Sequence, residues 1–323
     1  MLETLRANLL SPIPLAFALG VLTRVLRSEF VLPKDLYTSI SIYLLFALGL
    51  KGGAELAHAS IAAVAAPAGV TILLGILTPL SAYAVMRWVG RFSTADSAGM
   101  AAHYGSVSAV TFIAAQQFTV RVGHPSEGYM PTLLTLLESP GIHVALLLGA
   151  LQRDAAHDQG IRALRGVLHE VFTGRTMILL VGGLCVGYLM GESGWTAVAP
   201  FFDAPFKGAL MLFLLEMGIV AGARLGDLRK VGPFLIAYGI VVPLIHGTLG
   251  AVLGHLAGLS VGGATVLGSM AASASYIAAP PAVRLTLPEA NPTLSLTAAL
   301  AITFPFNLLF GIPFYYRIAL AMS

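Results

Sequence analysis

The chain has 323 residues, of which 57% are hydrophobic and only 10% are charged, and its mean hydropathy is +0.86. These values exclude an ordinary soluble domain and are typical of a protein with many membrane spans. The single cysteine, Cys185, excludes a disulfide framework within the chain. The isoelectric point is near 9.1, but the basic residues are scattered between apolar segments. We therefore expect no nucleic-acid binding and treat these residues as markers of membrane orientation.

Apolar segments of spanning length predict ten membrane helices. Those of the first half cover residues 11–26, 36–54, 61–87, 95–121 and 129–151, and those of the second half cover 175–191, 203–223, 231–257, 261–286 and 292–319. Between the halves, Ile161, Leu164, Val167 and Leu168 recur at helical spacing and predict a short amphipathic helix on the membrane surface. The chain is thus expected to consist of a first five-helix repeat (1–152), a cytoplasmic linker (153–174) and a second five-helix repeat (175–323).

Lysines and arginines orient these ten spans. Thirteen of them, Arg87, Arg91 and Arg284 included, fall on one side of the membrane and five on the other, which accounts for all 18. Because positively charged loops stay in the cytoplasm, the linker is predicted to be cytoplasmic and both termini to face outward. We expect a multi-pass protein of the inner (plasma) membrane, in contact with membrane lipid.

The fourth segment of each half is unusually rich in small residues. In Ser97–Ala115 and Val261–Ala279, 12 and 13 of 19 residues respectively are Gly, Ala, Ser or Thr. One such stretch alone favours close helix packing. Two of them at corresponding places predict discontinuous helices that cross at the membrane midplane and line a site there.

Landmarks recur between the two halves at a nearly constant offset. The offset ranges from 161 residues (Pro131 to Pro292) to 169 residues (Gly49 to Gly218), and Pro79 pairs with Pro243 at 164. Because each half holds an odd number of spans, the two copies are expected to lie inverted in the membrane, as in many secondary transporters.

Broken helices supply binding groups without charged side chains. Amides at the start of a half-helix carry positive partial charge and suit an anion, whereas freed carbonyls and hydroxyls suit a small cation such as sodium. The candidate hydroxyl groups belong to Ser106, Ser108, Thr111, Ser269, Ser273 and Ser275.

Few ionisable or amide side chains fall well within the predicted spans. Glu138 and Glu216 are the two carboxylates there. Two roles stay equally open for Glu138. In one it binds the coupling ion or takes part in gating, and in the other it is protonated and bonded to the backbone. Glu216 is interpreted as structural. His103 and His143 lack partners at metal-ligand spacing, so no transition-metal site is expected.

Four motifs resemble the sodium-dependent bicarbonate transporter family, whose best-known members serve the cyanobacterial carbon-concentrating mechanism. They are HYGSVSAVTF (His103–Phe112), SASYIAAP (Ser273–Pro280), LPEANPTLSLTAAL (Leu287–Leu300) and ITFPFNLLFGIP (Ile302–Pro313). The resemblance implies sodium-coupled bicarbonate uptake by a homotrimer with a core and a gate domain. The linker looks shorter than in cyanobacterial members, where a PII-type protein inhibits transport, so such a regulator stays an open question.

The resemblance also implies positions for the ligands. It places bicarbonate near Gly105, Ser106, Val107, Ser108, Ala271, Ala272 and Ser273. It places sodium, the coupling ion, near the oxygen donors Thr111, Ser275, Glu138 and Asn307. A packing role for the Asn307 amide remains the alternative. No organic cofactor is expected.

Four rival functions were weighed against symport of bicarbonate. A sodium/proton antiporter requires a carboxylate at the helix crossing, and Asp96 lies only at a span end. A serine hydrolase built on Ser106 or Ser108 lacks a G-x-S-x-G turn, so an enzyme is not expected. A sodium symporter for another small carboxylate or organic anion stays open as the alternative, and only a flux measurement separates a transporter from a bicarbonate sensor.

Overall fold

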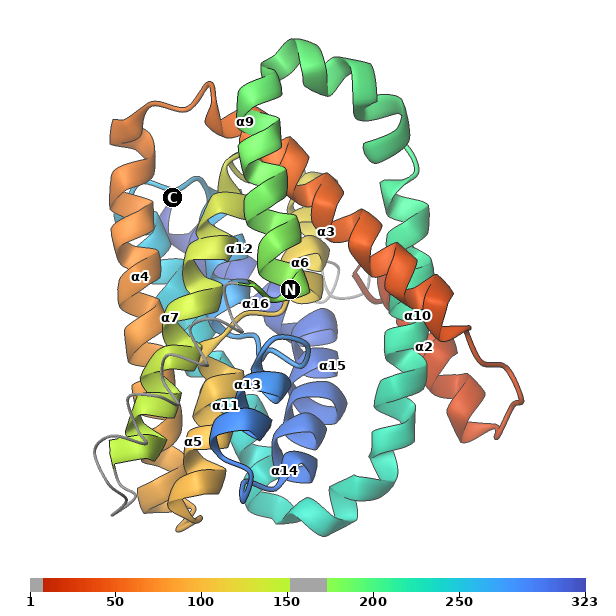
Figure 1. The fold of residues 1–323 in the computed structure, drawn as a ribbon, viewed down its shortest axis with the longest axis vertical. Coiled ribbons are helices and arrows are strands. Elements are labelled where there is room, and N and C mark those ends of the chain that lie inside the picture. Colours follow the sequence, from red (N-terminus) through yellow and green to blue (C-terminus); the bar gives the residue numbers. More distant parts are fainter. Residues whose placement is uncertain (1–7, 152–172) are drawn as a thin grey trace.

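The computed structural model describes residues 8–151 and 173–323, and every regular element in these ranges is helical (Figure 1). The first half contains α2 (Pro12–Val25), α3 (Lys34–Leu56), α4 (Ile61–Ala84) with a π-helical turn (Val85–Val89), α5 (Thr94–Gly105), α6 (Ala109–Arg121) and α7 (Met130–Leu151). The second half contains α9 (Arg175–Phe202), α10 (Phe206–Arg224), α11 (Leu228–Leu256), α12 (Val261–Ala271), α13 (Ala279–Thr286), α14 (Pro292–Thr297), α15 (Phe304–Phe306) and α16 (Ile312–Met322). The last three are joined by π-helical segments into one continuous rod.

Seven helices of the described residues are long and apolar enough to cross a membrane. The other three predicted spans differ for local reasons: Pro12–Val25 is shorter, and the two segments rich in small residues are each split in two. The membrane-protein class is therefore confirmed, whereas the count of ten spans stays a prediction. The predicted surface helix falls on residues 152–172, which lie outside the described ranges.

The prediction that the sixth span ends at residue 191 is wrong, because the helix continues beyond it. Gly191 has a positive φ of 59° and bends the chain there, but helix α9 then continues to Phe202 where a loop was expected. The Tyr43 ring stacks on Phe202 with centroids 5.7 Å apart, and Lys51 pairs with Asp203 at 2.8 Å. These contacts with α3 hold the continuation against the rest of the fold, which hydropathy alone does not reveal.

One group of helices, called the four-helix group below, consists of α2, α3, α9 and α10. In it α2 crosses α10, and α3 crosses α9, with the backbones nearly touching. A Cβ on Gly20 would lie 2.9 Å from the Gly218 Cα, and one on Gly49 would lie 2.9 Å from the Gly183 Cα. Only glycine fits at both crossings.

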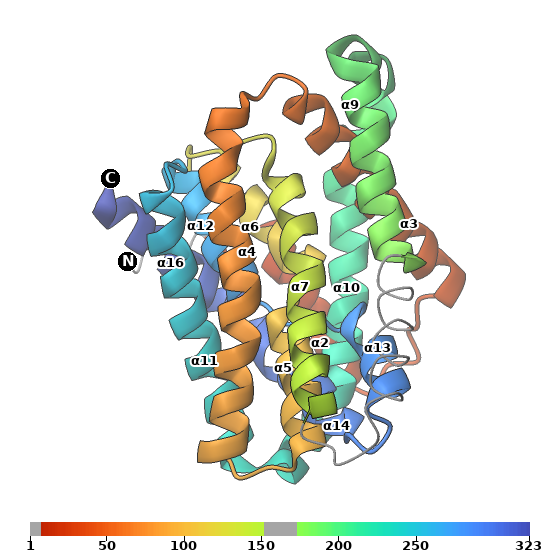
Figure 2. The same cartoon turned by 60° about the vertical axis from the view of Figure 1, so that its left-hand side comes forward.

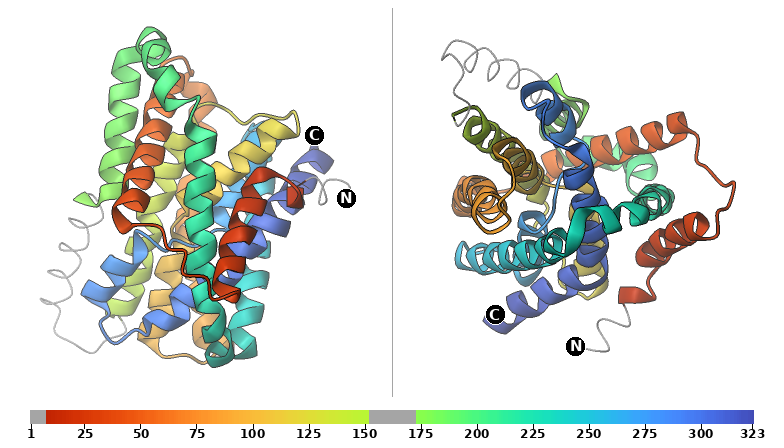
Figure 3. Two further views of the ribbon diagram at one scale, coloured as in Figure 1. Left: turned by 90° about the vertical axis from the view of Figure 1, so that its right-hand side faces the viewer. Right: turned by 90° about the horizontal axis from the view of Figure 1, so that it is seen from below.

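The remaining helices, α4–α7 and α11–α16, form a second group, hereafter the large group. Figure 2 shows α4, α11 and α16 on one side of the molecule and α3 and α9 on the other. Figure 3 shows α2 beside α10 and α3 beside α9. The two groups also meet just before α2, where the Asn8 side-chain amide donates to the Leu308 carbonyl of the π-helical segment before α16 at 2.9 Å. Both broken helices belong to the large group, and their broken ends lie where the two groups meet.

Candidate functional site

Both segments rich in small residues are interrupted, as predicted. The first break comprises residues 106–108, where Ser106 is extended (φ −103°, ψ 167°) and the Ser108 hydroxyl caps α6 by accepting from the Thr111 amide at 3.3 Å. The second break comprises residues 272–278, where the Ser275 hydroxyl accepts from the Ala278 amide at 3.2 Å and from the Ala279 amide, the first of α13, at 3.3 Å. Serine suits both places because its side-chain oxygen satisfies amides that have no partner within the helix.

Gly105 lets the first break lie directly against two neighbouring helices. A Cβ there would lie 2.6 Å from the Pro79 Cβ on α4 and 3.1 Å from the Gly141 Cα on α7. A Cβ on Gly141 would in turn collide with the Gly105 carbonyl oxygen. A larger residue at either position would push the break away from α7.

The two breaks contact each other through hydrogen bonds. The Ser108 amide donates to the Ser273 hydroxyl at 2.8 Å. The His103 carbonyl accepts from the Ser275 amide at 2.7 Å, and the His103 Nδ1 lies 2.6 Å from the Ser275 carbonyl. Residues that are more than 160 positions apart in sequence therefore form one buried unit.

A small cavity lies between these breaks and the four-helix group. Its volume is about 30 Å³, against the roughly 10–15 Å³ that one water needs on this measure. From the breaks it is lined by Val107, Ser108, Ala109, Val110, Ser275, Tyr276, Ile277 and Ala278; from the four-helix group it is lined by Ser41, Leu44, Leu45, Thr176, Leu210 and Phe213. The first residues of α6 and those preceding α13 both face this cavity, so positive helix ends approach it from two directions.

Glu138 is the one carboxylate among the residues that line this cavity. Its side chain is 3% exposed, and its Oε2 has no hydrogen-bond partner within the described part of the chain. The Glu138 carbonyl accepts from the Ser106 hydroxyl at 3.2 Å, which ties α7 to the first break. Glu138 also lines a neighbouring pocket that includes Arg175 and Thr176 at the start of α9. Glu138 is thus common to the walls of both spaces.

The residues expected around bicarbonate lie together but differ in exposure to the cavity. Val107 and Ser108 line it. Ser273 lies behind them, and its hydroxyl accepts from Ser108 and donates to the Met270 carbonyl at 2.8 Å. Gly105, Ser106, Ala271 and Ala272 are buried in the surrounding packing.

The wall at the second break is formed by residues 275–278, of which Tyr276, Ile277 and Ala278 were not predicted as ligands. The motif SASYIAAP contains all of them, but its spacing does not indicate which residues face inward.

The four oxygen donors expected around sodium separate into two places. Glu138 and Ser275 line the cavity, and Thr111 is buried in the first turn of α6 beside Ser108. Asn307 instead donates to the Ala272 carbonyl at 2.8 Å, and its Oδ1 accepts from the Tyr315 hydroxyl at 3.1 Å. In this arrangement the Asn307 amide supports the second break from behind.

Other polar residues inside the helices do not form a metal centre. Within the described ranges, no group of three or more His, Cys, Asp or Glu side chains could hold a metal ion. His246 contacts the Ser81 hydroxyl at 2.6 Å between α11 and α4. Glu216 lies on α10 and lines none of the cavities described here.

A bundle of apolar helices with two broken helices meeting at a buried cavity has the architecture of a multi-pass membrane transporter. The comparison with protein families makes this specific. The chain belongs to the Na⁺-dependent bicarbonate transporter superfamily, whose sequence profile matches residues 12–320. The family predicted from the four motifs is therefore confirmed. A comparison with curated proteins gave no significant match.

Proposed function

We propose that this protein carries sodium and bicarbonate together into the cell as a symporter, and that it does not act as an enzyme. The observation that carries the proposal is the pairing in one small cavity of two helix starts with a single buried carboxylate. Helix starts suit an anion, and a carboxylate with hydroxyl groups suits sodium. A cavity of about 30 Å³ favours a one-carbon anion over a bulky organic acid.

The anion is proposed to bind at the start of α6. Amides in the first turn of a helix have no intrahelical acceptor, and Ala109 and Val110, in that turn, line the cavity. The hydroxyl groups of Ser108 and Ser275 offer further hydrogen bonds from the two breaks. The Ser273 hydroxyl acts indirectly, because it holds the Ser108 amide in place.

Sodium is proposed to bind beside Glu138, with Thr111 and Ser275 as further oxygen donors. A buried carboxylate without a partner is costly in a membrane protein, and a bound cation offsets that cost. Sodium next to the helix starts also reduces the net charge that the anion brings into the cavity. In this scheme sodium binds first and creates the anion site.

Transport is proposed to result from movement of the large group against the four-helix group. The cavity shares Glu138, Thr176, Ile277 and Ala278 with the pocket at the start of α9. At its other end Leu44 and Ile113 lie one helical turn from Leu48 and Gln116, which line a separate pocket. The structure is thus more open toward the start of α9, which the distribution of basic residues predicts to be cytoplasmic.

An inverted repeat is proposed as the origin of the architecture. Ser81 contacts His246, and Ser108 contacts Ser273, and each pair is separated by 165 residues. A pseudo-two-fold axis through both contacts would produce this equal spacing.

A second pair of contacts obeys the same proposed symmetry at the two ends of the molecule. The Asp96 carboxylate accepts from the Asn291 amide at 2.8 Å, and the Glu127 carboxylate accepts from the Ser260 amide at 2.6 Å. In each, a residue near the start of one repeat's broken helix meets the loop before the other repeat's last span.

The homotrimer, the outward termini, the inner-membrane location and a PII-type cytoplasmic regulator also remain proposals.

The test is uptake of labelled bicarbonate into proteoliposomes with and without an inward sodium gradient. Accumulation that requires sodium and is not outcompeted by acetate or formate would support bicarbonate symport. Sodium-driven flux of a small carboxylate without bicarbonate flux would keep the architecture and replace the substrate. Saturable bicarbonate binding with no flux of any anion would instead indicate a sensor.

A further inference from the structure

A second pocket lies away from the candidate transport site, between α5, α13 and the start of α14. Its volume is about 90 Å³, and its polar lining comes from Asp96, His103, Arg284, Asn291 and Ser295. None of these residues lines the cavity at the two breaks. Part of its wall, Pro288 to Pro292, belongs to the connection before α14, which is predicted to lie on the cytoplasmic face.

His103 connects this pocket to the candidate transport site. The side chain is 1% exposed, and its Nδ1 must carry the proton because it lies 2.6 Å from the Ser275 carbonyl, which can only accept. In the neutral ring Nε2 is then an acceptor, and it has no hydrogen-bond partner among the residues that the structure describes. One imidazole therefore contacts the second break with one nitrogen and leaves the other for the pocket.

Arg284 supplies the positive charge. No ion pair involves its side chain within the described residues, although it lines the pocket with His103. The neighbouring polar groups are already occupied: both Asp96 oxygens accept hydrogen bonds, from the Asn291 amide at 2.8 Å and the Ser93 hydroxyl at 2.7 Å.

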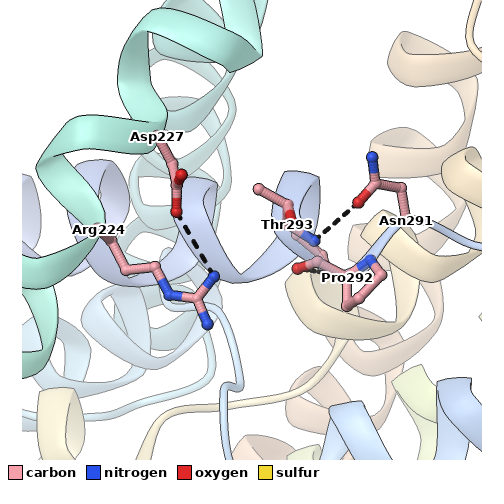
Figure 4. Close-up of polar contacts among 6 residues, drawn as sticks. Arg224, Asp227, Asn291, Pro292 and Thr293 are labelled. Atoms are coloured by element: carbon pink, nitrogen blue, oxygen red, sulfur yellow. Dashed lines mark hydrogen bonds and ion pairs between the residues drawn. The ribbon is translucent and has the colours of Figure 1, made fainter.

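Two further groups near α14 are likewise engaged, as Figure 4 shows. The Asn291 side-chain oxygen accepts from the Thr293 amide at 3.0 Å, and Arg224 pairs with Asp227 at 3.8 Å. A free guanidinium and a free imidazole acceptor thus remain for a ligand.

We infer that this pocket binds a carboxylate that carries its own hydroxyl donor, with bicarbonate as the smallest example. The carboxylate would lie toward Arg284, and its hydroxyl would donate to the His103 Nε2. Occupancy would restrain His103 and through it Ser275, so that anion accumulated in the cytoplasm slows further uptake. The choice of bicarbonate and the effect on uptake rest on the proposed function, whereas the pocket chemistry does not.

The binding test uses the full-length protein with ¹⁵N-labelled histidine, titrated with bicarbonate in detergent. The Ser108→Leu variant, whose added bulk fills the transport cavity, isolates the second pocket. We expect saturable movement of the imidazole signal that is missing in His103→Gln, and about a tenfold loss of affinity in Arg284→Gln. Arg27→Gln, on the same predicted face but outside the pocket, is the matched control and should bind normally.

Formate tests the hydroxyl requirement, because it has the carboxylate but no O–H. It should bind about three- to tenfold more weakly than bicarbonate. Equal affinity for formate, no response in Ser108→Leu, or normal affinity in Arg284→Gln would each overturn the inference. In proteoliposomes, internal bicarbonate should lower the initial uptake rate of the wild type and of Arg27→Gln but not that of Arg284→Gln. A wild type without sodium-driven flux would refute the proposed function, while the histidine titration would still decide on the pocket.

Discussion

The two breaks arise from similar stretches of sequence but have different surroundings. The first break is three residues long, and the Ser108 hydroxyl caps its own helix at the cavity wall. The second break is seven residues long, and its polar groups bond to neighbours: Ala272 to Asn307, and Ser275 to His103. Both breaks line the cavity, but the second has the more extensive bonding to the helices behind it.

The same asymmetry appears one helix further along each repeat. Glu138 and Thr303 are related by the 165-residue offset that also relates Ser108 to Ser273. Glu138 leaves one buried carboxylate oxygen without a partner, whereas Thr303 donates to the Gly239 carbonyl at 2.7 Å and contacts Tyr104. Gly239 lies four residues before Pro243, so Thr303 satisfies a carbonyl that the proline leaves without its helical partner. One repeat keeps a buried carboxyl group without a partner for one of its oxygens, and the other uses the equivalent position to support a proline-containing helix.

The largest expected effect is that of Glu138→Gln. The amide keeps the shape but removes the charge that is proposed to bind sodium, so sodium-driven uptake should fall by about 100-fold. Initial rates as a function of sodium concentration in proteoliposomes would measure it. Thr303→Val should lower thermal stability but keep the sodium dependence, and Glu216→Gln should change neither. Normal sodium dependence in Glu138→Gln would refute its assignment as a ligand.

A bulky side chain at the first break should lower uptake nearly as much as Glu138→Gln. A leucine at position 108 cannot fit a cavity of about 30 Å³ without displacing its walls, so Ser108→Leu should lower uptake by about 100-fold. Ser273→Leu should also abolish uptake, because it removes the acceptor of the Ser108 amide. Size-exclusion profiles and thermal unfolding in detergent would verify that both variants assemble. Full activity of either variant would contradict the site.

Removing single hydroxyls should separate the roles of the two serines. Ser273→Ala leaves the buried Ser108 amide unpaired, which should cost about 1–3 kcal/mol of stability. Ser108→Ala removes a helix cap worth about 1 kcal/mol and a proposed anion contact, so the KM for bicarbonate should rise more than in Ser273→Ala. Thermal unfolding and uptake kinetics of both variants would measure the difference. If the KM rose more in Ser273→Ala than in Ser108→Ala, Ser273 would be the anion contact and Ser108 the supporting residue.

Asn307→Ala should affect stability far more than sodium affinity. It leaves the Ala272 carbonyl without its Asn307 partner, at a cost of about 1–3 kcal/mol, whereas the Tyr315 hydroxyl keeps the Pro243 carbonyl as its acceptor. Thermal unfolding in detergent, together with the sodium concentration that gives half-maximal uptake, would test this expectation. A large rise in that concentration at unchanged stability would instead make Asn307 a sodium ligand.

The smallest expected effect is that of Ser275→Ala on folding. The hydroxyl accepts from the Ala278 and Ala279 amides just before and at the start of an eight-residue helix, so its loss should cost about 1 kcal/mol. The backbone contacts with His103 persist, since they use the Ser275 amide and carbonyl. Unfolding in detergent would measure the loss, and a much larger value would mean that the second break depends on this side chain.

The sequence by itself determined the membrane class, the positions of most helices and the places where two of them break. Apolar length defines a helix in lipid because each backbone group must be satisfied internally, and clustered small residues mark where that pattern fails. It also determined the family, through motifs on both sides of the breaks.

Tertiary structure decided which residues face the cavity and which support it. Hydropathy cannot distinguish Glu138, which has a buried oxygen without a partner, from Thr303, which bonds to a carbonyl, because both lie in apolar helices. The role of Asn307 and the helix after Gly191 likewise depend on neighbours distant in the chain, Tyr315 and Tyr43 among them. Contacts between residues 165 positions apart, such as Ser81 with His246 and Ser108 with Ser273, are set by packing of the two halves, and no local pattern encodes that packing.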